Sequence, residues 1–287
     1  MGRRCPEAQR RPRGMAWIIT ITGVDGRGDE HRMRGLDRKV AVVAGGAGGI
    51  GTATSVRLAE EGARVVVGDL DEQSALGVAE EIARRGGEAV PHRCDISVED
   101  DVAGLIARAV DEFGGVDVLH ANAADLSPGT IGEDSDAAQI DLEVFDRTMR
   151  VNMRGHFLCA RQVIPELLKR GGGAVVFTSS AAAFAGEPER PAYAMAKSAN
   201  HALVRHIASR WGKDGIRANA VAPGVVLAAS VRDSLNAEFL ERVLRLSRSP
   251  RLGTPEDIAA MVAFLASDDG EWFNGQVFDV DGGAILR

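Results

Sequence analysis

The stretch Val40-Ala-Val-Val-Ala-Gly-Gly-Ala-Gly-Gly-Ile-Gly51 decides the fold, because five apolar residues run directly into a glycine-rich turn. A continuous apolar run is typical of a parallel strand that is covered on both faces. Glycines let the backbone approach a ligand closely, and the helix that follows presents its positive end to an anion. A plain turn is the other interpretation, but the position after a first strand favours a diphosphate site. Its predicted residues are Gly45, Gly48, Gly49, Ile50 and Gly51.

Apolar, β-rich runs alternate with helix-like segments from Lys39 onward. Strands are expected at residues 40–44, 64–68, 88–94, 116–120, 174–178, 216–221 and 276–280. Two helices are expected to start at Ser97 and Thr254, where a capping residue precedes acids that suit the helix dipole. Unbroken alternation predicts a single α/β domain over residues 35–287. Its predicted core is a doubly wound, Rossmann-like sheet of seven parallel strands with helices on both faces.

Composition excludes several classes of protein. The 287 residues are 45% hydrophobic and 26% charged, a balance that indicates a globular core. A net charge of -7 and only 5% aromatic residues argue against a nucleic-acid partner, and no apolar run is long enough to span a membrane. The three cysteines and six histidines show no metal-ligand spacing, so no metal is expected. The odd cysteine count favours a reducing, cytoplasmic location.

Residues 1–34 differ in kind from the rest of the chain. Several arginines precede a short apolar stretch and then a Gly/Asp-rich segment, with no convincing signal-cleavage site. We interpret this segment as a disordered extension, or as the product of a start codon placed too early, with Met33 as the true beginning.

Asp69 ends the second expected strand and lies 18 residues beyond Gly51. At that place a carboxylate accepts hydrogen bonds from the ribose hydroxyls of an adenosine, and it repels a 2′-phosphate. A solvated loop aspartate is the alternative. Together with the neighbouring Leu70, Asp69 is therefore expected to bind the cofactor and to favour NAD over NADP.

Tyr193 and Lys197 lie four residues apart in a helix-like segment, so their side chains share one face. The ammonium is expected to lower the pKa of the phenol from its usual value of about 10, and so to prepare it for proton exchange with an alcohol. Ordinary helices also carry such a pair, although Tyr193 is the only tyrosine of this chain. Ser180 follows the fifth strand, where its hydroxyl is expected either to bind a substrate oxygen or to cap a turn.

In these residues the chain resembles the short-chain dehydrogenase/reductase family, in its single-domain branch, from about residue 35 to the end. The resemblance rests on motifs that occur in the family's order and spacing. They are Gly45-xxx-Gly49-x-Gly51, Asp69, Cys94-Asp95-Ile96, Ala121-Asn122-Ala123-Ala124, Asn152, Ser180, Tyr193-xxx-Lys197, Pro223-Gly224 and Asp281-Gly-Gly283.

The resemblance implies roles for the residues that match. Tyr193 would be the general acid/base, Lys197 would lower its pKa and hold the nicotinamide ribose, and Ser180 would position the substrate. Asn152 would hold a water that links Lys197 to solvent, or would make a helix-kink hydrogen bond instead. Asp95 and Ile96 would flank the adenine, Asn122 and Ala123 would line the cofactor floor, and Pro223, Gly224 and Val226 would border the nicotinamide. The resemblance also implies a homotetramer.

The sequence departs from the family at two places. Ala121 and Ala124 replace the Asn and Gly of the usual Asn-Asn-Ala-Gly, which puts a loop hydrogen bond in doubt. Ala228 stands where a threonine often holds the nicotinamide carboxamide, and Ser230 is the nearest hydroxyl.

Three segments are expected to contact the substrate. Residues 125–143 are acidic and longer than usual, which indicates either a solvated loop or recognition of a cation. Residues 181–186 are small and apolar, and residues 225–250 suit either a lid over an apolar substrate or a subunit contact. The sequence thus predicts an NAD(H)-dependent oxidoreductase of a secondary alcohol or ketone. The alternatives are an NADP-dependent 3-oxoacyl thioester reductase and a non-catalytic nucleotide-binding regulator.

Overall fold

The structure, a computed structural model, describes residues 32–228 and 237–286. The chain divides after Arg32 into two units, and the second unit carries the sheet. Most of the expected extension, residues 1–31, therefore lies outside the described residues. The N–H of Met33 donates to the Glu61 carboxylate at 2.6 Å, and Arg34 forms an ion pair with Asp269, so both residues contact the folded unit.

Seven parallel strands form one sheet, as the alternation of segments predicts. In chain order they are β1 (Val40–Ala44), β2 (Arg64–Asp69), β3 (Glu88–Arg93), β4 (Val118–Ala121), β5 (Gly173–Thr178), β6 (Ile216–Pro223) and β7 (Val277–Val280). Their order across the sheet is β3-β2-β1-β4-β5-β6-β7, and every neighbouring pair is parallel. The direction of winding reverses between β1 and β4, which opens a crevice at the carboxyl ends of these two strands.

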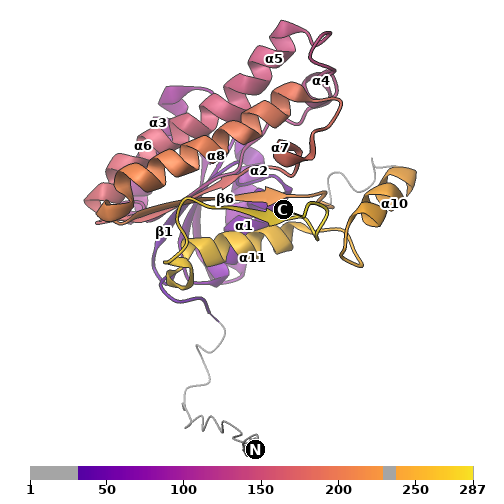
Figure 1. Cartoon of the computed structure of the whole chain (residues 1–287). Coiled ribbons are helices and arrows are strands. Elements are labelled where there is room, and N and C mark those ends of the chain that lie inside the picture. The colour runs from indigo at the N-terminus through magenta and orange to yellow at the C-terminus, as the bar shows by residue number, and fades with distance from the viewer. Residues whose placement is uncertain (1–31, 229–236, 287) are drawn as a thin grey trace, which may run out of the picture. The chain divides into compact units, whose positions relative to one another are not determined.

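Helices cover both faces of the sheet (Figure 1). One face carries α1 (Gly49–Glu60), α2 (Glu72–Arg84) and α11 (Pro255–Ala266), and the other carries α3 (Glu99–Phe113), α6 (His156–Lys169) and α8 (Pro191–Trp211). The shorter helices are α4 (Pro128–Ile131), α5 (Leu142–Met149), α7 (Ala182–Ala185) and α10 (Ala237–Leu246). A π-helical turn, Arg150–Gly155, joins α5 to α6, and 3-10 turns span Gly212–Asp214 and Asp268–Gly270.

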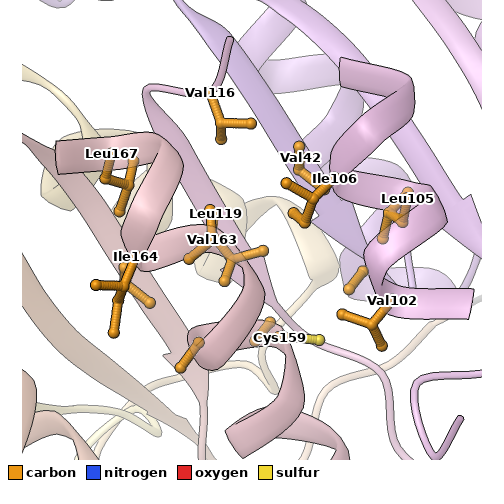
Figure 2. Packing of buried hydrophobic residues seen from close by; sticks show 14 of the residues in the cluster. Val42, Val102, Leu105, Ile106, Val116, Leu119, Cys159, Val163, Ile164 and Leu167 are labelled. Atoms are coloured by element: carbon orange, nitrogen blue, oxygen red, sulfur yellow. The ribbon is translucent and has the colours of Figure 1, made fainter. Parts of the chain in front are cut away.

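Alternate residues of β1 pack on opposite faces of the sheet. Val40 and Val42 pack with α3 and α6, whereas Ala41 and Val43 pack with α1, α2 and α11. Figure 2 shows the first of these contacts, with side chains of α3 and α6 meeting Val42 and Leu119 of the sheet. Because both faces are buried, the strand has no polar position, and this explains its continuous apolar sequence.

One of the two predicted helix starts is wrong and the other is confirmed. Ser97 does not cap α3: the capping position is Val98, and the Ser97 N–H donates to the Asp95 carboxylate at 2.9 Å. Asp95 and Ser97 instead form a tight turn, and the cap lies one residue later than predicted. At α11 the Thr254 N–H donates to the Asp257 carboxylate at 2.8 Å, and Pro255 occupies the first helical position.

Replacing Leu105 by alanine tests the core. Leu105 is fully buried on α3 and packs against Gly68 of β2, where a Cβ would lie 2.7 Å from its methyl groups. Leu105→Ala should lower the free energy of unfolding by about 2–5 kcal/mol, because it removes buried methyl groups and leaves a cavity. Urea denaturation followed by circular dichroism measures this loss. Leu76→Ala, at a partly exposed position of α2, serves as the control and should cost less than 1 kcal/mol.

Candidate active site

A cavity of about 730 Å³ opens at the carboxyl ends of the strands. It brings together residues that the sequence spreads over 180 positions, from the glycine turn to β6. The predicted residues on its wall are Gly45, Gly48, Gly49, Ile50, Asp69, Leu70, Asp95, Ile96, Asn122, Ala123, Ser180, Tyr193, Lys197, Pro223, Gly224 and Val226. Gly51 and Asn152 are buried just behind the wall. The winding of the sheet thus collects these groups at one edge, although their individual roles stay predictions.

The glycine turn is shaped by two close approaches. Gly45 has a φ of +80°, and a Cβ at Gly51 would lie 1.8 Å from the Gly45 carbonyl oxygen, so neither position accepts a side chain. A Cβ at Gly48 would meet no atom within 4 Å, because this residue borders the cavity at the start of α1. The turn therefore leaves room for a diphosphate beside the positive end of a helix, and the site fits a dinucleotide.

Asp69 lies at the end of β2, beside the glycine turn. One carboxylate oxygen accepts the Ala47 N–H at 2.9 Å, and the other accepts the Asp71 N–H at 3.3 Å. Each carboxylate oxygen has a second lone pair for a ribose hydroxyl. The carboxylate is thus held in place by the same turn that would hold the diphosphate.

Lys197 is almost completely buried, with 1% of its surface exposed. Its Nζ donates to the Thr178 carbonyl oxygen at 2.8 Å and lies 5.8 Å from the centre of the Tyr193 ring. Burial lowers the pKa of this ammonium to about 7. The predicted proximity of the two side chains is therefore present.

The expected direction of the Tyr193 pKa shift is wrong for the ligand-free chain. Burial raises the pKa of the phenol above its usual value, and a hydrogen bond with Ser180 acts in the opposite direction without cancelling the rise. The charge of Lys197 predicts a lowered pKa, but the loss of hydration around the phenol has the larger effect.

Asn152 lies in the π-helical turn between α5 and α6 and is fully buried. Neither the oxygen nor the nitrogen of its amide has a hydrogen-bond partner among the described residues. The irregular helix is present, but the amide does not make the kink hydrogen bond that was one of its two interpretations. A buried amide with free donors and an acceptor suits a bound water, as the other interpretation requires.

Two polar residues that the sequence analysis passed over hold this region together. His156 is fully buried; its Nε2–H donates to the Ala123 carbonyl at 2.9 Å, and its Nδ1 accepts from the Asn200 amide at 2.9 Å. Burial and the charge of Lys197 lower the pKa of His156 to about 3, so the ring is neutral. The sequence held a signal for these contacts: His156 lies one helical turn after Asn152, and Asn200 lies one turn after Lys197, each in a largely apolar helix.

A second chain of hydrogen bonds links the glycine turn to β4 and β5. The Asn122 amide donates to the Gly45 carbonyl at 2.8 Å and accepts from the Thr178 hydroxyl at 2.9 Å. The His120 Nε2–H in turn donates to the Thr178 hydroxyl at 2.8 Å. Ala121, where the family has asparagine, packs in the core, and the neighbouring Asn122 is bonded to Thr178.

The second departure from the family, at Ala228, lies on the cavity wall. Ala228 lies against Gly49 on the cavity wall and offers no hydroxyl there, and Ser230 falls outside the described residues, as does part of the expected lid. Within residues 32–228 and 237–286, no cluster of three or more His, Cys, Asp or Glu side chains suits a metal ion. No helix in these two ranges is long and apolar enough to cross a bilayer.

A doubly wound sheet whose crevice joins a glycine turn, an acid after β2 and a Tyr–Lys–Ser group defines a dinucleotide-dependent oxidoreductase. Comparison with known proteins agrees. A family model described as Enoyl-(Acyl carrier protein) reductase matches residues 45–284. A probable short-chain type dehydrogenase/reductase of Bradyrhizobium diazoefficiens is 41% identical over 254 residues, which cover 88% of this chain and 89% of that protein.

Two further similar proteins are both 7alpha-hydroxysteroid dehydrogenases. The 7alpha-hydroxysteroid dehydrogenase of Escherichia coli K12 is 34% identical over 87% of this chain and 95% of its own. A solved 7alpha-hydroxysteroid dehydrogenase, complexed with NADH and 7-oxo glycochenodeoxycholic acid, superposes with a TM-score of 0.81. It is 33% identical, over 88% of this chain and 96% of that one. The chain belongs to the short-chain dehydrogenase/reductase family and is an oxidoreductase of hydroxyl and carbonyl groups.

The raised pKa of Tyr193 can be measured directly, because the chain has no other tyrosine. In the ligand-free protein the phenol should stay protonated through neutral pH and ionise only above about pH 10, since burial disfavours the phenolate. The near-ultraviolet absorbance of phenolate, recorded while circular dichroism shows a folded chain, gives the midpoint. Tyr193→Phe should show no such signal. A midpoint below pH 10 would contradict the dominance of burial.

Proposed function

We propose that the chain moves a hydride between the nicotinamide of NAD(H) and the carbon of a secondary alcohol or ketone, with Tyr193 as general acid/base. The observation that carries this proposal is that Tyr193, Lys197 and Ser180 line the same cavity as the glycine turn and Asp69. The bound dinucleotide supplies the hydride donor or acceptor, which no side chain provides. The protein contributes position, charge and a route for the proton.

Each side chain has one task in this reaction. The Tyr193 phenol takes the hydroxyl proton when an alcohol is oxidised and returns it when a ketone is reduced. The Ser180 hydroxyl, already bonded to the phenol, holds the substrate oxygen beside it. Lys197 places a positive charge next to the ring and favours the phenolate during the reaction. Asn152, with its unpartnered amide, holds a water through which the proton leaves the buried site.

The chemistry of Asp69 supports NAD as the cofactor. Its carboxylate is held beside the glycine turn, where a 2′-phosphate would meet a like charge. The solved 7alpha-hydroxysteroid dehydrogenase that resembles this chain was complexed with NADH. For the substrate we propose an apolar alcohol or ketone, because Val226 and Ala228 border the cavity.

Two other functions are tested by the same assays. The matching family model is named after a reductase of an acyl-carrier-protein thioester, so an NADP-dependent 3-oxoacyl thioester reductase is kept as an alternative function. A nucleotide-binding regulator would bind the dinucleotide without turnover. A panel of secondary alcohols, a hydroxysteroid and a 3-oxoacyl thioester, each assayed with both cofactors, separates the three.

Exposed apolar side chains and buried thiols bear on the assembly and the location of the protein. We propose a homotetramer in which the helices that bear Asn152 and Tyr193 meet between subunits, because Phe157 of α6 and Met195 of α8 expose 47% and 52% of their surfaces. A cytoplasmic location is supported by Cys94 and Cys159, which are both buried free thiols.

Removing the phenolic hydroxyl tests the mechanism. Tyr193→Phe should lower kcat by about 10²- to 10⁴-fold, because the proton then has no acid or base in the site. Reduced-cofactor absorbance measures turnover, and calorimetric titration should show that NAD still binds. The matched control is Ser209→Ala, which removes a hydroxyl at an exposed position of the same helix and should keep parental turnover. Unchanged turnover in Tyr193→Phe would refute the mechanism.

Removing the Asp69 carboxylate tests the choice of cofactor. Asp69→Ala should raise the KM for NAD by about 10- to 100-fold through the loss of hydrogen bonds to a charged group, and should lower the KM for NADP. Steady-state kinetics with both cofactors measure the change. Asp71→Ala removes a neighbouring acid that only caps α2 and should leave the preference unaltered. A parental enzyme that already prefers NADP would make the assignment wrong.

A further inference from the structure

The helix that carries Tyr193 has no cap of its own. Its capping position is Arg190, which has a φ of +67° and makes no side-chain capping bond, and its first residue is Pro191. The N–H groups of Ala192 and Tyr193 in the first turn have no partner within the helix. In most helices a serine, threonine or aspartate directly before the first turn accepts such bonds. Here the local sequence Arg-Pro-Ala-Tyr supplies none.

Asp134 supplies the missing cap from 58 residues earlier in the chain. It is 2% exposed, and its two carboxylate oxygens accept the N–H of Ala192 at 3.2 Å and the N–H of Tyr193 at 2.8 Å. The Arg190 N–H donates in the opposite direction, to the carbonyls of Asp134 at 2.9 Å and Ser135 at 3.0 Å. The acidic segment is thus joined to the helix start by four hydrogen bonds. This buried role for Asp134 differs from both a solvated loop and a cation site.

The beginning of that segment is also held by hydrogen bonds, at the rim of the cavity. The Asp125 carboxylate accepts from the Ser127 hydroxyl and from the Thr130 hydroxyl, both at 2.7 Å. The Arg147 guanidinium donates to the Thr130 hydroxyl at 2.9 Å and also to the Gly129 carbonyl. Asp125 and Arg147 line the cavity. The segment from Asp125 to Asp134 therefore links the cavity wall to the first turn of α8.

We propose that Asp134 is a positioning residue for Tyr193. Its carboxylate binds the backbone of the residue whose phenol would move the proton, so it sets where that phenol stands relative to Ser180 and the cavity. A negative charge at the start of α8 also complements the helix dipole. Small displacements of a reacting group reduce rates strongly, so losing this contact should affect the chemical step more than dinucleotide binding. The inference rests on the proposed function of Tyr193.

The experiment compares Asp134→Ala and Asp134→Asn with Glu133→Ala, which removes an adjacent, exposed acid. At a temperature where all variants are folded by circular dichroism, Asp134→Ala should lower kcat by about tenfold and leave the calorimetric Kd for NAD within about twofold. Asp134→Asn keeps one acceptor oxygen and should recover part of kcat. Glu133→Ala should behave as the parent. If Asp134→Ala does not fold, the same comparison is made with Asp134→Asn.

Amide hydrogen exchange gives a readout that does not need activity. Exchange at Ala192 and Tyr193 should become about 10- to 100-fold faster in Asp134→Ala and remain parental in Glu133→Ala. Faster exchange with a parental kcat would overturn the positioning role and leave a purely structural cap. Tyr193→Phe is assayed alongside: if it is inactive while Asp134→Ala is fully active, only this inference fails. If Tyr193→Phe is itself active, the proposed function fails and the positioning role fails with it.

Discussion

The contact between Gly45 and Gly51 is the constraint on which the rest of the molecule depends. A Cβ at Gly51 would lie 1.8 Å from the Gly45 carbonyl oxygen, so α1 can leave β1 at this angle only because Gly51 has no side chain. This approach lets α1 pack on the sheet beside α11 and leaves the end of α1 open toward the crevice between β1 and β4. The fold and the diphosphate site therefore share one steric cause.

The buried Lys197 is the centre of the polar part of the site. Its ammonium is bonded to the Thr178 carbonyl, and the Thr178 side chain continues through Asn122 to the carbonyl of Gly45. On its other side the neutral ring of His156 ties Ala123 to Asn200. The histidine ring can lie near the lysine because burial and that charge keep it uncharged. Helix α8 and the loop after β4 are thus parts of one hydrogen-bonded structure.

Burial shifts the pKa values of both Tyr193 and Lys197, an effect that their spacing in the sequence does not reveal. The Tyr193 pKa is raised by burial, and the Lys197 pKa is lowered to about 7 by the same cause. Burial thus shifts both groups toward their neutral forms. We infer that the low dielectric which shifts both groups also strengthens each interaction with a charge that develops during the reaction.

The sequence alone determined the strand order along the chain, the glycine turn and the group Ser180, Tyr193 and Lys197, because each depends on short-range patterns of residue type and spacing. A parallel strand that is buried on both faces has a continuous apolar sequence. All seven strands were therefore predicted close to their true positions. The start of α3 was misplaced because the Asp95 carboxylate accepts the Ser97 N–H in a turn that precedes the helix.

Only the tertiary structure decided which distant groups complete the site. Asp134 caps a helix that begins 57 residues later, and Asn200 meets a histidine 44 residues before it. No local pattern encodes such pairs, because an acid in a polar loop looks the same whether it faces water or the end of a helix. The sign of the Tyr193 pKa shift also required the structure, since hydration depends on everything that packs around the phenol and not on the neighbour one turn away.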